Sequence, residues 1–94
     1  MEDKILTLHP EGKAGVNISK DKYVTICGAI TQALEAAGVL TFTELTEIIG
    51  QKIGDSFDGS IAWYVTTVKL DLEARGVIER IPKSSPQQLT LAGE

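Results

Sequence analysis

Residues 72–81 read Leu72-Glu73-Ala74-Arg75-Gly76-Val77-Ile78-Glu79-Arg80-Ile81. Apolar residues at helical spacing lead into this run, and Gly76 is a typical helix stop because glycine takes a positive φ without strain. After Gly76, a β-prone run, a short polar segment over residues 82–86 and a second β-prone run over residues 87–91 predict a strand, a turn and a strand. We therefore expect a helix that leads directly into a β-hairpin.

Two more helices are predicted upstream. Ser19 is a good N-cap, apolar residues then recur at helical spacing from Tyr23, and Gly38 ends the first helix. Thr41 and Glu44 form a capping-box pattern that starts a second helix, which runs to about residue 54. The short β-prone segment between these helices, around residues 40–41, is expected to pair with the C-terminal hairpin.

These elements predict an α+β fold in the order helix, strand, helix, helix, strand, strand, with a small antiparallel sheet. We expect an N-terminal arm over residues 1–18 that packs on the domain, the domain itself over residues 19–91, and a frayed tail over residues 92–94. A weak strand near Ile5 and a loop at residues 9–15 fall within the arm. The predicted core consists of Tyr23, Ile26, Cys27, Ile30, Leu34, Leu45, Ile48, Ile49, Ile61, Val65, Val68, Leu72, Ile78, Leu89 and Leu91.

The run from Leu72 to Arg80 resembles winged-helix transcription regulators. Their third helix commonly ends in Leu-Glu, two variable residues, Gly, an aliphatic pair and a charged pair, and the resemblance covers about residues 20–91. It implies a winged helix-turn-helix domain with three helices, used for binding either DNA or protein. The whole chain also looks like a small uncharacterised bacterial winged-helix family, on the strength of residues 9–13 and of residues 63–73.

Composition limits the possible partners. The chain has 94 residues, is 43% hydrophobic, contains one cysteine and has a net charge of −4, which together fit one small cytoplasmic domain. It has no apolar run long enough for a membrane span, and the acidic start of the sequence leads us to expect no secretory leader. A DNA-binding surface needs clustered Lys and Arg to neutralise phosphates, but here the basic residues are scattered.

The first hypothesis for function is a DNA-binding protein of weak sequence specificity, either a transcription regulator or an accessory chromosomal protein. On a helical wheel, the third helix turns Trp63, Thr66, Thr67, Leu70 and Ala74 away from the core, with Lys69 and Glu73 on one flank and Asp71 on the other. No residue between Gly59 and Val68 can read a base through paired hydrogen bonds. The candidate contacts with double-stranded DNA are Ser60, Thr66, Thr67, Lys69, Arg80 and Lys83.

The alternative is a protein-interaction module that binds through the face carrying Trp63 and Leu70. An exposed tryptophan beside further apolar residues is unusual for a solvated surface. We expect Trp63 to be mostly buried, with the arm (through Leu6, Leu8, Val16 or Ile18) as its cover. A second copy of the chain or another protein is the other candidate cover.

Nothing in the sequence predicts an enzyme, and we expect no cofactor, metal ion or small-molecule substrate. His9 has no second histidine or cysteine close to it in the sequence, which gives a metal site almost no support. Cys27 lies on the inner side of the first helix, as expected of a small core residue. Residues 12–15 contain Gly and Lys but lack the order of a phosphate-binding loop.

Overall fold

The computed structural model describes residues 3–9, 11–12, 15–83 and 86–92. Within these residues the chain is an α+β protein with three helices and two small antiparallel sheets, which confirms the predicted class. The elements are β1 (Lys4–Leu6), β2 (Asn17–Ser19), α1 (Lys20–Ala37), β3 (Val39–Thr41), α2 (Phe42–Ile53), α3 (Ile61–Ala74), β4 (Ile78–Arg80) and β5 (Gln88–Leu91).

Local capping chemistry fixes where the helices begin and end. The Ser19 hydroxyl accepts the Lys22 amide at the start of α1, and Gly38 ends that helix with φ 83°. Thr41 and Glu44 form the predicted capping box at the start of α2. Because each pattern satisfies backbone groups that a helix end leaves free, the boundaries could be predicted from sequence.

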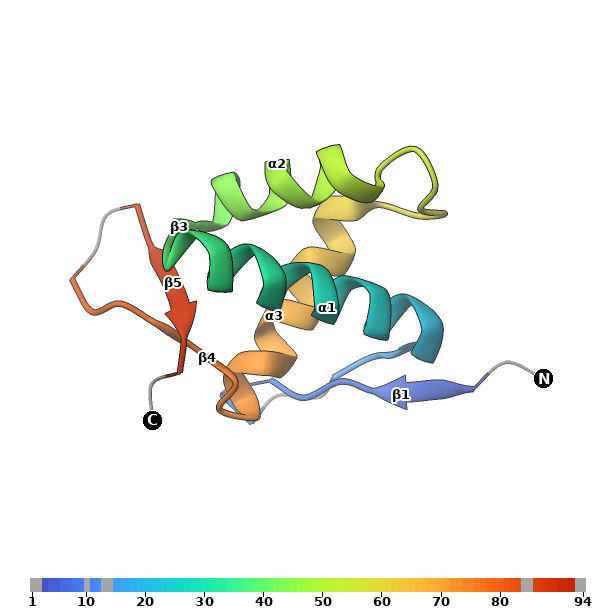
Figure 1. Cartoon of the computed structure of the whole chain (residues 1–94). Coiled ribbons are helices and arrows are strands. Elements are labelled where there is room, and N and C mark those ends of the chain that lie inside the picture. The colour runs from blue at the N-terminus through green and yellow to red at the C-terminus, as the bar shows by residue number, and fades with distance from the viewer. Residues whose placement is uncertain (1–2, 10, 13–14, 84–85, 93–94) are drawn as a thin grey trace.

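A three-stranded sheet closes one end of the molecule, in the order β3-β5-β4 (Figure 1). β5 is the central strand and pairs antiparallel with both neighbours, with Leu40 opposite Leu89 and Ile78 opposite Leu91. The predicted pairing of the segment around residue 40 with the C-terminal hairpin is therefore confirmed. Gly76, with φ 77°, makes the turn that leads from α3 into β4.

The N-terminal segment forms a hairpin of its own, because β1 pairs antiparallel with β2. The sequence predicted a weak strand near Ile5 but gave no sign of its partner. The Thr7 hydroxyl bonds both the amide and the carbonyl of Val16, and a Cβ on Gly15 would lie 1.7 Å from the Thr7 carbonyl oxygen. This close backbone contact requires glycine at position 15. In Figure 1 the hairpin runs below α1 and α3, away from the three-stranded sheet.

The core lies between the helices and the inner face of the three-stranded sheet. Ten of the predicted core residues are buried, and the other five, Tyr23, Cys27, Ile48, Ile61 and Leu91, are partly buried and pack against them. The prediction missed Ile18, Ala29, Ala33 and Leu40, which are also buried. It also missed three buried polar residues, Thr7, Lys69 and Asp71, and two of these belong to α3.

Some of the predicted features fall outside the described residues. They are Met1 and Glu2 of the predicted arm, Pro10, Lys13 and Ala14 of the predicted loop, Ser84 and Ser85 of the predicted turn, and Gly93 and Glu94 of the expected tail.

Candidate interaction surface on helix α3

Trp63 lies in the first turn of α3 and is 46% exposed. The expectation that it would be mostly buried under the N-terminal arm is therefore wrong. The wheel correctly turned Trp63 away from the core. It could not show where along α3 the N-terminal segment would cross, and that segment meets the later turns of α3, beyond Trp63.

A short chain of aromatic contacts holds the indole in place. The Trp63 and Tyr64 rings pack edge to face, with 4.9 Å between their centroids. The Tyr64 and Phe57 rings pack in the same way, with 5.1 Å between their centroids. The Lys22 ammonium lies over Tyr64 and Phe57, at 5.3 Å and 5.8 Å from the ring centroids. These contacts fix the orientation of Trp63 on one side and leave the rest of the indole open to solvent.

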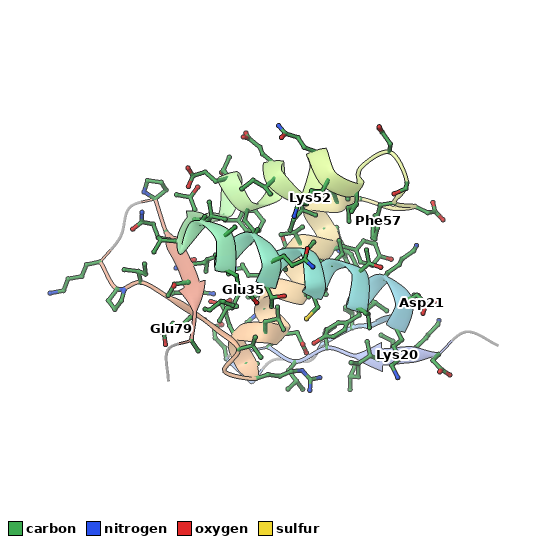
Figure 2. The ribbon with its side chains drawn as sticks, in the orientation of Figure 1. Lys20, Asp21, Glu35, Lys52, Phe57 and Glu79 are labelled. Carbon is green, nitrogen blue, oxygen red and sulfur yellow. The ribbon has the colours of Figure 1, made fainter. Side chains whose placement is uncertain are left out.

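A shallow hollow of about 330 Å³ lies next to this aromatic group, between the start of α1 and the turn from α2 to α3. Asp21 and Phe57, labelled in Figure 2, lie at this end of the molecule and line it. Its rim carries Asp21, Lys22 and Asp58, and the Lys22 ammonium is 4.0 Å from the Asp58 carboxylate. The hollow is open and its charges are mixed, so it points to no ligand class.

The N-terminal segment covers the second half of the outer face of α3. Between them is a cavity of about 110 Å³, lined by Thr67 and Leu70 from α3 and by Leu8 and Val16, among other residues, from the N-terminal segment. We call this cavity the socket. Thr67 and Leu70 are half-buried there, whereas Leu8 and Val16 remain exposed.

A buried carboxylate fixes the N-terminal segment to α3. Asp71 is fully buried, and one of its oxygens accepts the Leu8 amide at 2.8 Å. The other oxygen accepts the Tyr23 hydroxyl and the Arg75 Nε, the latter at 2.8 Å. Burial, together with the hydrogen bond to Asp71, raises the pKa of the Tyr23 phenol. The cluster thus joins three parts of the fold, α1, α3 and the segment after β1.

Lys69 does not lie on an exposed flank as predicted, since it is only 7% exposed. Its ammonium is 3.3 Å from the Glu73 carboxylate and 5.7 Å from the centroid of the Phe42 ring. The wheel placed Lys69 and Glu73 side by side, but the start of α2 packs over them. A buried and paired ammonium is a poor contact for phosphate.

Arg80 shares the same carboxylate. Its side chain is 44% exposed and its Nε and Nη2 bond the two oxygens of Glu73. This hydrogen bond, with a smaller contribution from Glu11, raises the pKa of the Arg80 guanidinium. Two of the predicted phosphate contacts, Lys69 and Arg80, are therefore brought together around Glu73, which neutralises part of their charge.

The other candidate DNA contacts are separate from this pair. Lys83 is exposed in the turn after β4, with φ 62°. The Ser60 hydroxyl accepts the Trp63 amide, and the Thr66 hydroxyl donates to the Ala62 carbonyl. Both residues are exposed beside Trp63. The open part of the outer face of α3 thus consists of Ser60, Trp63 and Thr66 and carries no charge.

The sequence analysis expected Leu8 and Val16 to cover Trp63, whereas they lie instead against Thr67 and Leu70 at the socket. It placed Asp71 on a flank of the helix, and it did not identify Thr7. Asp71 gave one usable signal, because it lies between Leu70 and Leu72 with Arg75 four residues later, where an i, i+4 ion pair is expected. The contacts of Leu8 and Tyr23 with Asp71 join residues far apart in the chain. No local pattern indicates such contacts.

Two further features bear on the kind of site. The described residues contain no group of three or more His, Cys, Asp or Glu side chains placed to hold a metal ion. In the same part of the chain, none of the helices combines the length and the hydrophobicity that crossing a membrane requires.

The chain was compared with known proteins and with models of protein families. No curated protein matches the chain, and no solved structure does. A family model described as a family of unknown function, DUF6958, matches residues 4–89, which include the N-terminal hairpin, all three helices and most of the C-terminal hairpin. The chain therefore belongs to the DUF6958 family.

Proposed function

We propose that the chain is a winged-helix module that binds another protein through the open face of α3, with Trp63 as the anchor. The winged-helix part of the proposal is supported by the order of the elements from α1 onward and by the pairing of β3 with β5 of the C-terminal hairpin. A fold of this kind can bind either DNA or protein, so the choice between these partners rests on the chemistry of the exposed surface. The observation that carries the proposal is the exposure of Trp63 on a neutral face.

The energetics of the indole favour a protein partner. Covering an aromatic side chain of this size contributes about 2–3 kcal/mol from apolar area, and tryptophan is enriched among the residues that dominate protein interfaces. The edge-to-face contact with Tyr64 holds Trp63 in one place. Less side-chain freedom is therefore lost on binding than for a mobile side chain.

The distribution of charge argues against DNA. The net charge is −4, Lys69 is buried against Glu73, and Arg80 is bonded to that same carboxylate. Of the three basic residues predicted to meet phosphate, only Lys83 has no ion pair among the described residues. Binding to duplex DNA requires several phosphates to be neutralised together, which a single lysine does not achieve.

Site-specific photocrosslinking tests the proposal in cells that produce the chain. A photoreactive phenylalanine derivative would replace Trp63 in one variant and Val24 in a matched control, since Val24 is exposed on α1. We expect discrete protein adducts from position 63 and none of the same mass from position 24. The masses of the adducts separate a second copy of the chain, which adds 10.1 kDa, from a different protein.

Equal labelling at both positions, or no protein adduct at position 63, would refute a binding role for this face. A nucleic acid adduct at position 63 would favour the DNA-binding alternative instead.

A further inference from the structure

The outer face of α3 carries a projection and a recess on the same stripe. Trp63 projects from the first turn, and the socket opens beside Thr67 and Leu70. Trp63 and Leu70 are seven residues apart, which is about two turns, or about 10.5 Å along the helix. Only the small side chains of Thr66 and Thr67 stand between them on this face.

We infer that this face pairs with a second copy of the chain, with the two α3 helices antiparallel about a two-fold axis between Thr66 and Thr67. In a two-fold interface, residue i of one copy meets residue j of the other and the converse also holds. An axis at this point brings Trp63 onto the partner's Leu70 and Leu70 onto the partner's Trp63. The inference rests on the proposed function and names the partner.

The sizes of the two features are compatible. The socket holds about 110 Å³, which is enough to take the leading edge of an indole ring but not the whole side chain. Leu8 and Val16 stand exposed at the socket, so an entering ring meets apolar side chains from the N-terminal segment as well as from α3. Each dimer contains two such contacts, which doubles the apolar area covered.

The charge on this face also suits a second copy. Two chains with a net charge of −4 each repel one another, and a contact surface without charge adds no further repulsion between the copies. Ser60, Trp63 and Thr66 on the open part of the face and the half-buried Thr67 and Leu70 at the socket supply such a surface, since none of them is ionisable. The lining of the socket also includes His9. The charged residues of α3 are Lys69, Asp71 and Glu73, and they are paired within the chain.

Reciprocal charge variants, measured by sedimentation equilibrium, test the inference. One variant carries Thr66→Glu and Thr67→Glu, and the other carries Thr66→Lys and Thr67→Lys. Each change puts like charges across the two-fold axis in a homodimer and opposite charges across it in a mixed pair. Glu and Lys favour helix at least as well as Thr does, so α3 is retained, which circular dichroism checks.

We expect the wild type to dimerise, each charge variant to be monomeric alone, and an equal mixture of the two to restore the dimer. Trp63→Ala should weaken dimerisation by at least about tenfold, whereas Val24→Glu on the exposed side of α1 should leave it unchanged.

A wild type that stays monomeric at high concentration would overturn self-pairing. If position 63 still crosslinked to a different protein, the proposed function would stand without it. Charge variants that both remain dimeric would also overturn the inference, because the interface would then lie elsewhere.

Discussion

Asp71 and Trp63 show what a helical wheel can and cannot predict. Both lie off the predicted core stripe of α3, and Trp63 is 46% exposed as that position implies, yet Asp71 is fully buried. The N-terminal segment accounts for Asp71, because Leu8 donates its amide to that carboxylate. The same segment explains the exposure of Trp63, because it covers α3 at the socket, beside Thr67 and Leu70, and does not reach Trp63. A helical wheel predicts the direction in which each side chain points from the helix axis. It does not predict which other segment of the chain packs against that side chain.

Replacing Asp71 by Asn tests the buried carboxylate. Asparagine keeps the shape but removes the charge that Arg75 meets, and it turns a donor toward groups that are themselves donors. We expect a loss of about 1–3 kcal/mol in the free energy of unfolding, measured by urea denaturation. Glu79→Gln on exposed β4 is the control and should change stability by less than about 0.5 kcal/mol. Equal effects of the two changes would mean that Asp71 does not hold the segment.

Tyr23 gives a prediction for alkaline pH. Its pKa is raised in the folded protein by burial and by the hydrogen bond to Asp71, whereas a tyrosine in an unfolded chain ionises at about pH 10. Above that pH the unfolded chain releases a proton that the folded chain keeps, so stability falls as pH rises. We expect the wild type to lose stability more steeply above about pH 10 than Tyr23→Phe does. Parallel curves for the two proteins would contradict this reading of the hydroxyl.

At the scale of elements, the sequence predicted all three helices and the three-stranded sheet, because caps, glycine stops and apolar spacing are local signals. It did not predict the pairing of β1 with β2. Each strand has only three residues, and the pairing depends on the bonds of Thr7 with Val16 and on the space left by Gly15. Those contacts span the loop, where the sequence shows only turn-forming residues.

A pair of variants at Leu8 measures how firmly the hairpin is docked. Leu8→Pro removes the amide that Asp71 accepts, and Leu8→Ala keeps the amide while removing most of an exposed side chain. We expect Leu8→Pro to destabilise the fold by about 1–3 kcal/mol more than Leu8→Ala, because a buried carboxylate loses a donor. Hydrogen exchange at the Thr7 and Val16 amides should quicken in Leu8→Pro alone. No difference between the two variants would mean that the amide contributes nothing.

For the whole molecule, net charge and pairing decide which partners are compatible with the surface. The sequence showed basic residues scattered along the chain, but it could not show that Lys69 is buried or that Arg80 turns toward Glu73. The first depends on Phe42 and Glu73 meeting Lys69 in space, and the second on Glu73 of α3 meeting Arg80 of β4. The sequence thus predicted some of the residues of the candidate site. It could not predict which of them are exposed and unpaired, and so able to contact a partner.

We therefore expect no retardation of random duplex DNA by the wild type in a low-salt gel-shift titration. Glu73→Gln is the informative comparison, because it frees Arg80 and Lys69 from their shared carboxylate and should increase whatever weak binding exists. Strong retardation by the wild type that Lys83→Ala abolishes would support DNA binding in place of protein binding.

If a second copy of the chain covers Trp63, the fluorescence of the protein must change with its concentration, because Trp63 is the only tryptophan in the sequence. Emission would be recorded across a dilution series of the wild-type protein. We predict the red-shifted, readily quenched emission of an exposed indole at the lowest concentrations, and a blue shift with slower acrylamide quenching as concentration rises. Emission that stays red-shifted and readily quenched at every concentration would contradict pairing through Trp63. A blue-shifted emission at every dilution would contradict the open face itself.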